Sequence, residues 1–229
     1  MQTLKLRLNR RCCRTGFTLV ELLVVISIIL IASTVLFTAG SANKGASLRS
    51  SQGIVASIIK GARAQAVLKN AETRIIIYNE LTADADKYRR YFGVVYWGAD
   101  SNGVMGWLAA NKGTLLPEGI YFDPDLSKDF NLTSKMNLDY PRTKVGNNTN
   151  PTTGGGGEEY FYYAFENNGV LGTTFNNNWL ALRAGVLKPN GESFELDFTN
   201  PEDEYLRTAL ILRRAGSTTV VNDPELVTN

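Results

Sequence analysis

The sequence predicts an α+β fold in which a long N-terminal helix, membrane-spanning in its first half, packs on a head made of an antiparallel β-sheet. Three observations lead to this prediction. Residues 17–37 form an unbroken apolar run, residues 38–70 keep a helical period of apolar positions, and residues 71–229 consist of short β-branched or aromatic runs separated by turn sequences. One helix followed by many strands is typical of α+β domains with antiparallel sheets.

A basic leader, residues 1–16, precedes the apolar run. It contains five cations and no acid: Lys5, Arg7, Arg10, Arg11 and Arg14. Positive charge before an apolar span holds that end of the chain in the cytoplasm, so we expect the head to be exported. An ordinary secretory signal has a small-residue cleavage site behind its apolar region. Residues 39–42 fit such a site only loosely, whereas Gly16 is a small residue placed directly before the run.

The apolar run extends from Phe17 to Phe37, and Glu21 is the only charged residue among these 21. As a helix rising about 1.5 Å per residue it would be roughly 30 Å long, which matches the hydrocarbon core of a bilayer. A carboxylate inside such a span is expensive and usually functional. Two interpretations remain open. Either Glu21 pairs with the new α-ammonium of a neighbouring subunit after cleavage behind Gly16, or it snorkels to the interface in a plain membrane anchor.

The helix is expected to continue to about Asn70 with one buried face. Its apolar positions recur at steps of three, four or seven residues, with one step of a single residue, which indicates an amphipathic helix. These positions are Leu48, Val55, Ile58, Ile59, Ala62 and Ala66. The alternative is two helices with a flexible joint near residues 40–45, because Gly40 and Gly45 weaken helical structure.

The head is predicted from β-rich runs and the turns between them. Asn-Gly and Ala-Gly joints between such runs are hairpin signals. The expected strands are residues 74–78, 91–97, 104–109, 119–122, 160–165, 179–183, 193–198, 208–213 and 217–221. Between them lies the polar segment 144–159 with four consecutive glycines. It lacks the Lys-Ser/Thr ending of a phosphate-binding loop, so we expect a mobile insertion facing solvent.

Composition excludes several kinds of chemistry. The chain has no histidine, so it cannot build Ser-His-Asp or Cys-His catalysis or a His-containing zinc site. Both cysteines, Cys12 and Cys13, lie in the leader, which leaves the rest without disulfides or a thiol nucleophile. Without the five leader cations, 19 basic and 22 acidic residues remain, and this formal charge of −3 gives no reason to expect nucleic-acid binding. We therefore expect a protein that is not an enzyme and holds no cofactor.

Acidic residues gather at two places in the predicted loops. One group is Asp84 and Asp86, and the other is Asp123, Asp125 and Asp129. Spaced carboxylates in loops can hold calcium, but neither group matches a complete loop pattern such as the EF-hand. We expect a solvated acidic surface and assign no metal site.

Residues 16–21, Gly-Phe-Thr-Leu-Val-Glu, resemble the cleavage and N-methylation motif of the type IV pilin and type II secretion pseudopilin family. The resemblance implies that Gly16 precedes the cut, that Phe17 becomes the N-methylated terminus and that Glu21 is the assembly carboxylate. Farther along, Ala62-Arg63 with Ala66 ahead of the strand 74–78 is similar to the minor pseudopilins of the H type. The turn at residues 165–169 is similar to the same heads.

This resemblance implies a minor subunit of a type II secretion pseudopilus, a structural component in protein secretion across the outer membrane. The implied partners are a prepilin peptidase, other pseudopilin or pilin subunits, an assembly platform in the inner membrane and, before assembly, membrane lipid. The implied location is the bacterial inner membrane, crossed once, with the N-terminus cytoplasmic and the head periplasmic. After assembly, the subunit would lie in the pseudopilus or pilus.

Three alternatives remain. A minor pilin of a type IV pilus would carry the same leader motif. A single-pass, membrane-anchored binding protein would capture a ligand with its head and never polymerise. A membrane-anchored hydrolase would use acid pairs such as Asp123 and Asp125, although the absence of histidine and of a recognised catalytic motif weighs against it.

Overall fold

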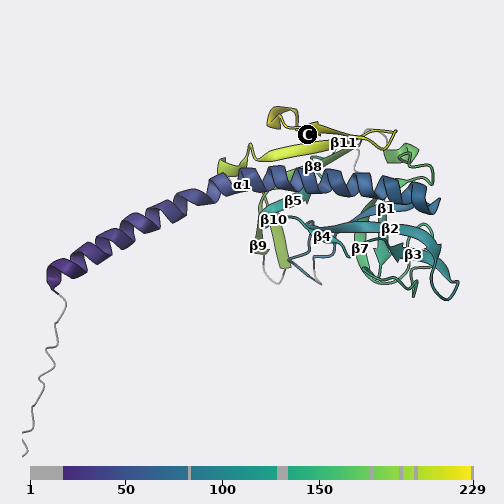
Figure 1. The fold of residues 1–229 in the computed structure, drawn as a ribbon, viewed down its shortest axis with the longest axis horizontal. Helices are drawn as coiled ribbons and strands as arrows, with labels where there is room; N and C mark the ends of the chain where they lie inside the picture. Colours follow the sequence, from purple (N-terminus) through teal and green to yellow (C-terminus); the bar gives the residue numbers. More distant parts are fainter. Residues whose placement is uncertain are drawn as a thin grey trace, which may run out of the picture. The chain divides into compact units, whose positions relative to one another are not determined.

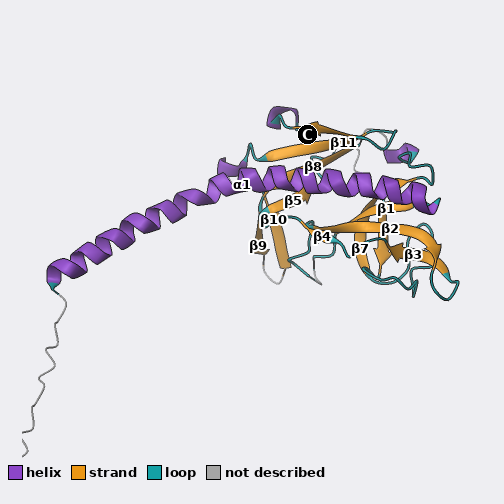
Figure 2. Cartoon of the chain, viewed as in Figure 1, coloured by secondary structure: helices purple, strands orange, loops and turns teal. Residues whose placement is uncertain are grey.

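The computed structural model describes residues 18–81, 84–127, 134–175, 178–190, 193–198 and 201–227 (Figures 1 and 2). It divides into two compact units, Met1–Gly40 and Ser41–Asn229. The second unit contains all the strands, and the predicted α+β class with antiparallel sheets is confirmed.

Helix α1 runs from Leu19 to Lys69, close to the expected limits. The helical assignment passes through Gly40 and Gly45 without a break, although Gly40 also ends the first compact unit. In the part of the chain that the structure describes, no helix has an apolar stretch of the length and hydropathy needed to cross a membrane. The expected membrane-spanning first half is therefore not confirmed and stays a prediction.

The C-terminus of α1 ends in a Schellman motif. Asn70 takes the left-handed conformation with φ +48°, which asparagine tolerates better than most residues. The Asn70 amide donates to the Val67 carbonyl (3.2 Å) and the Ala71 amide donates to the Ala66 carbonyl (3.1 Å). These two bonds satisfy carbonyls that have no partner within the helix. The chain then turns directly into the first strand.

The head contains two antiparallel sheets and a hairpin. The first sheet has the order β3-β2-β1-β7-β6, with β4 paired to β2. Its strands are β1 Thr73–Tyr78, β2 Tyr91–Ala99, β3 Met105–Ala109, β4 Thr114–Leu115, β6 Lys135–Leu138 and β7 Glu158–Phe165. The second sheet has the order β12-β11-β8-β5. Its strands are β5 Ile120–Asp123, β8 Trp179–Ala184, β11 Arg207–Leu212 and β12 Thr218–Val221.

The remaining elements are short. The hairpin pairs β9 Val186–Asn190 with β10 Ser193–Asp197. Three 3₁₀ helices are Thr173–Phe175, Pro201–Asp203 and Pro224–Leu226. All nine expected strands are present, whereas β4, β6 and β9 were not predicted from the sequence. Each of these three is short or interrupted by polar residues and proline, so its apolar period is too weak to read.

The buried face of α1 packs against both sheets of the head, and Figure 1 shows strands of each sheet on either side of it. Leu48, Val55, Ile59, Ala62 and Ala66 are buried in one cluster with side chains from both sheets. The small side chains of the two alanines let the helix lie close to the strands. The prediction of the buried face is confirmed at these five positions. Ile58 also packs against this cluster but is only partly buried, so the prediction is confirmed there in part.

Substitution of Ile59 should reveal this packing. Ile59 is fully buried, so Ile59→Ala should reduce the free energy of unfolding by about 2–5 kcal/mol. Ile58→Ala removes the same atoms from a half-buried site and should cost roughly 1 kcal/mol. Urea unfolding of the full chain, followed by tryptophan fluorescence, would measure both. Equal losses for the two variants would contradict the assigned helix face.

Residues 142–155 join the two outer strands of the first sheet. On the β3 side, Ala109 donates its amide to the Arg142 carbonyl and Trp107 donates to the Asn148 carbonyl, both at 2.9 Å. On the β6 side, Asn137 donates its amide to the Thr153 carbonyl (2.9 Å) and accepts from the Gly155 amide (3.0 Å). The segment thus covers two strand edges that would otherwise expose unpaired backbone groups. The sequence predicted a mobile insertion here, and its mobility stays a prediction.

Candidate functional site

The first turn of α1 is closed by a reciprocal pair of hydrogen bonds between Thr18 and Glu21. The Glu21 amide donates to the Thr18 hydroxyl oxygen (3.2 Å), and the Thr18 amide donates to Glu21 Oε2 (3.5 Å). Thr18 directly precedes the first helical residue, Leu19, so this is a capping box with Thr18 at the N-cap and Glu21 at the third helical position. The arrangement satisfies two amides that the helix itself leaves without partners.

The position of Glu21 also suits its charge. A carboxylate in the first turn lies near the positive end of the helix dipole, and this interaction is favourable. Oε2 is used by the cap, whereas no described residue donates to Oε1. The side chain is exposed within the first unit. One carboxylate oxygen therefore holds the helix terminus, and the other has no donor among the described residues.

Sequence reasoning missed Thr18. Its Thr-x-x-Glu spacing to Glu21 is a known helix-start signature and would have identified it. Gly16 and Phe17, the predicted cleavage residues, lie outside the described residues. The roles assigned to Gly16, Phe17 and Glu21 stay predictions.

Beyond the cap, α1 exposes apolar side chains on every face of its described first part. Leu19 and Leu30 are 81% and 66% exposed, and Ser27 satisfies its own hydroxyl by donating to the Leu23 carbonyl at 2.8 Å. The other exposed large apolar residues here are Val20, Leu22, Leu23, Val24, Val25, Ile26, Ile28 and Ile29. A contiguous apolar surface of this kind marks a site of association with another apolar partner.

The acidic groups considered for calcium have other roles in the structure. Asp123 is buried, and its Oδ1 accepts from the amides of Asp125 (3.0 Å) and Leu126 (3.4 Å). Burial raises the pKa of the Asp123 carboxyl, and Arg183 Nη1 lies 3.7 Å from its Oδ2. Asp129 lies outside the described residues. The expectation of a solvated surface was therefore wrong for Asp123, which organises a turn.

The second acidic group is held by a neighbouring cation. Asp84 forms an ion pair with Lys87 at 2.9 Å, and the hydrogen bond to Lys87 lowers the pKa of the Asp84 carboxyl. Across the described ranges, no three histidine, cysteine or acidic side chains come together as a metal site would require.

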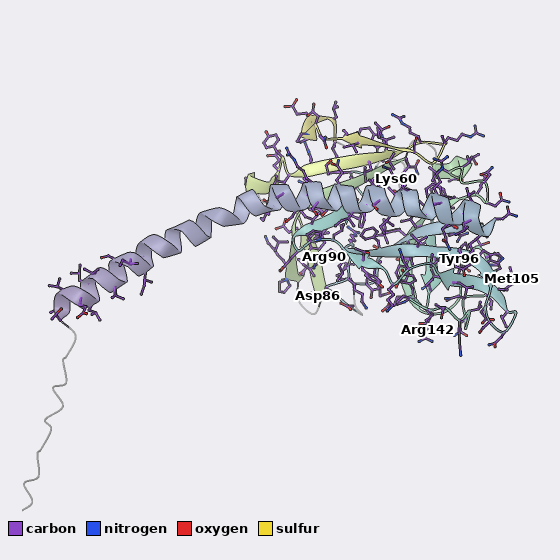
Figure 3. All side chains as sticks on the ribbon, in the orientation of Figure 1. Lys60, Asp86, Arg90, Tyr96, Met105 and Arg142 are labelled. Carbon is purple, nitrogen blue, oxygen red and sulfur yellow. The ribbon has the colours of Figure 1, made fainter. Side chains whose placement is uncertain are left out.

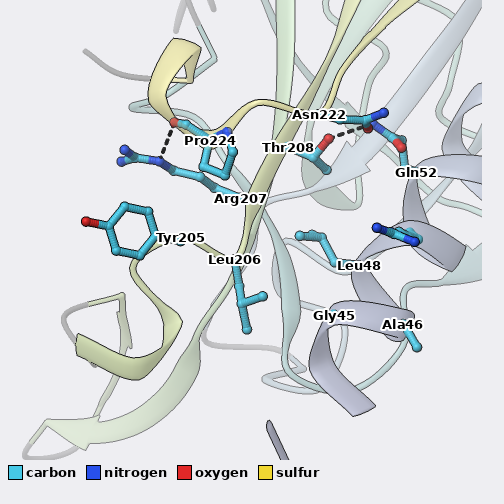
Figure 4. Close-up of a pocket in the computed structure, with 11 residues that line it drawn as sticks. Gly45, Ala46, Leu48, Gln52, Tyr205, Leu206, Arg207, Thr208, Asn222 and Pro224 are labelled. Carbon is cyan, nitrogen blue, oxygen red and sulfur yellow. Dashed lines mark hydrogen bonds between the residues drawn. The ribbon is translucent and has the colours of Figure 1, made fainter. Parts of the chain in front are cut away.

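A pocket of about 860 Å³ lies in the head between α1, the start of β11 and the segment that follows β12 (Figure 4). In its lining, Thr208 donates its hydroxyl to the Val221 carbonyl (2.7 Å) and accepts from the Gln52 amide nitrogen (2.5 Å). Arg207 donates Nε to the Pro224 carbonyl (2.8 Å) at the other end. These bonds fasten both α1 and the C-terminal segment to β11, so we assign the polar groups a structural role.

Comparison with known proteins gives one family match. Residues 11–37 match the family described as the prokaryotic N-terminal methylation motif. The match includes the end of the leader, the Gly16-Phe17 junction, Glu21 and the apolar run, and it leaves the head unmatched. No curated protein and no solved structure matches the chain.

Proposed function

We propose that the chain is a minor pseudopilin of a type II secretion pseudopilus, most like the H type, and that it is a structural subunit with no catalytic activity. The observation that carries the proposal is the prepilin-type motif at residues 11–37, which supports the type IV pilin and pseudopilin family. This motif is the recognition site of the prepilin peptidase and implies assembly with other pilin subunits. The H-type assignment rests on the resemblance of residues 62–66 and 165–169.

In the proposed pathway, the precursor is stored in the inner membrane with residues 1–16 in the cytoplasm and the head in the periplasm. Support comes from the sequence, which places five cations before 21 residues that contain a single charge. A separate prepilin peptidase cuts after Gly16 and methylates Phe17. The assembly platform then moves the helix from lipid to the other subunits.

Glu21 is proposed to set the axial position of the subunit by pairing with the α-ammonium of a neighbour. The cap geometry supports this role because it leaves Oε1 without a described donor while Oε2 holds Thr18. A buried ammonium needs such a partner, since an isolated charge in an apolar environment is strongly unfavourable. The carboxylate can therefore cap its own helix and bind a neighbour at the same time.

A minor pilin of a type IV pilus is the second candidate, because the prepilin-type motif is common to both systems. Copurification from membranes would separate them, since a pseudopilin should recover secretion-system subunits and a pilin should recover pilus subunits. A single-pass binding protein that never polymerises would recover neither and would keep its leader.

Processing at Gly16 tests the proposal. Gly16→Leu should leave only full-length precursor in membranes, because a bulky side chain at the cut would not fit a peptidase site shaped for glycine. Cys13→Leu introduces the same residue within the leader, away from the cut, and should be processed normally. Immunoblotting of cells with and without an active prepilin peptidase would distinguish the two forms. Peptidase-independent removal of the leader would refute the proposal.

A further inference from the structure

The charged residues of α1 beyond Glu21 are all basic. They are Lys44, Arg49, Lys60, Arg63 and Lys69. Lys44 pairs with Asp203 at 2.6 Å, and Lys69 lies over the Tyr96 ring at 5.2 Å. Among the described residues, no acid lies within 4.0 Å of the charged groups of the other three. The helix thus presents Arg49, Lys60 and Arg63 without an acidic contact in the described part of the chain.

These three cations share one flank of the exposed helix face. Arg49 and Lys60 are eleven residues apart and Arg63 follows three later, so they lie within about 60° of one another around the axis. Figure 3 labels Lys60 on this helix. Next to them, Val67 and Leu68 are 56% and 78% exposed. Lys60, Arg63, Ala64, Val67 and Leu68 border a shallow hollow of about 640 Å³.

One further exposed cation lies beside this face. A Cβ atom built on Gly216 would lie 2.7 Å from Arg63 Cδ, which places the β11–β12 turn and its exposed Arg214 beside the helix. The turn from Glu166 to Gly169 also lies beside this face, because a Cβ atom built on Gly169 would lie 2.8 Å from Val67 Cγ2. Glu166 itself borders a separate hollow with Lys69. Cβ atoms built on Gly53 and Gly61 would meet nothing within 4 Å, so a partner can approach the backbone closely.

We propose that the face of α1 from Arg49 to Leu68 docks a different protein subunit whose contacting surface carries carboxylates around an apolar strip. Charge complementarity selects this occupant. A second copy would bring the same cations to the same face, and like charges placed together at an interface cost several kcal/mol of binding free energy. Carboxylates would pair with Arg49, Lys60 and Arg63, while apolar side chains would cover Val67 and Leu68. The inference rests on the proposed function, because it states the kind of subunit that lies beside this one.

The test uses the full-length chain in membranes with a photo-crosslinking benzoylphenylalanine at Ala64, which is exposed. The expected adduct joins Ala64 to a different protein at a site flanked by Asp or Glu. Lys60→Glu with Arg63→Glu should reduce the adduct about tenfold, because two favourable charge pairs become repulsive. Lys112→Glu with Arg142→Glu changes the same number of exposed cations elsewhere on the head and should leave the adduct unchanged. In the chain with Lys60→Glu and Arg63→Glu, changing the partner's contacting acids to Lys should restore the adduct.

Three results would overturn the inference: an adduct with a second copy of the chain, an adduct that persists after reversal of Lys60 and Arg63, or no adduct. Cleavage after Gly16 is measured in the same samples. A processed chain without a charge-dependent adduct overturns the docking surface and leaves the proposed function standing. An unprocessed chain that forms the adduct overturns the proposed function and leaves the surface.

Discussion

Both Glu21→Ala and Glu21→Gln should lower incorporation into an assembled filament by about two to four orders of magnitude. Each variant leaves the α-ammonium of a neighbour without a charged partner in an apolar environment, which costs on the order of 3–5 kcal/mol. Membrane insertion should persist, because removing the charge makes residues 17–37 more apolar. Cleavage should persist too, because the cut is at Gly16-Phe17.

The comparison of the two variants separates the two tasks of Glu21. Glutamine can still close a capping box with Thr18, whereas alanine cannot. Thr18→Val removes the capping hydroxyl but keeps the carboxylate, and should cost only about 0.5–2 kcal/mol of helix stability. Partner subunits copurified at equal membrane levels would be quantified for all three. Full recovery of partners with Glu21→Gln would show that the cap, rather than the charge, supports assembly.

Arg74→Ala should destabilise the head by about 3–5 kcal/mol. Arg74 is 5% exposed, and its guanidinium lies between the rings of Trp107 (4.2 Å) and Tyr162 (4.1 Å). It donates to the carbonyls of Thr152 (3.0 Å) and Pro151 (2.9 Å). Removing it abolishes both ring contacts, each worth up to roughly 2 kcal/mol when desolvated, and the hydrogen bonds to both carbonyls.

The loss of Arg74 should also loosen residues 142–155, because Arg74 binds the Pro151 and Thr152 carbonyls of this segment. Arg74→Lys should recover little of the stability lost in Arg74→Ala, because a single ammonium cannot reproduce the planar contacts of a guanidinium with two rings and two carbonyls. Arg142→Ala is the control, since Arg142 is 64% exposed and forms a surface ion pair with Asp139. Urea unfolding would give the free energies, and amide exchange at Asn137 and Gly155 would report the segment. Equal stability of the Arg74→Ala and Arg142→Ala variants would contradict this account.

The features predicted well from the sequence are those with a strong local period. The buried face of α1 followed from apolar steps between Leu48 and Ala66, because a helix repeats every 3.6 residues. The nine expected strands followed from β-branched and aromatic runs such as Ile75–Ile77. The capping box of Thr18 and Glu21 was equally local and could have been predicted.

The features missed depend on contacts between distant residues. Segment 142–155 has no apolar period, so nothing local indicates that Arg142 and Asn148 pair with β3 while Thr153 pairs with Asn137 of β6. The sequence predicted Arg74 only as a residue of the strand 74–78, because Trp107 and Tyr162 come into contact with it only after the sheet forms. Asp123 was predicted to be a surface acid for the same reason, although folding buries it beside Arg183.

The most direct test of the central claim is the mass and N-terminal sequence of the mature chain, recovered from membranes that contain an active prepilin peptidase. We predict a chain that begins at N-methyl-Phe17 and lacks residues 1–16, including Cys12 and Cys13. A chain that still begins at Met1 would contradict prepilin processing. A chain that begins after Phe37 would identify an ordinary secretory signal and would contradict the assembly role of Glu21.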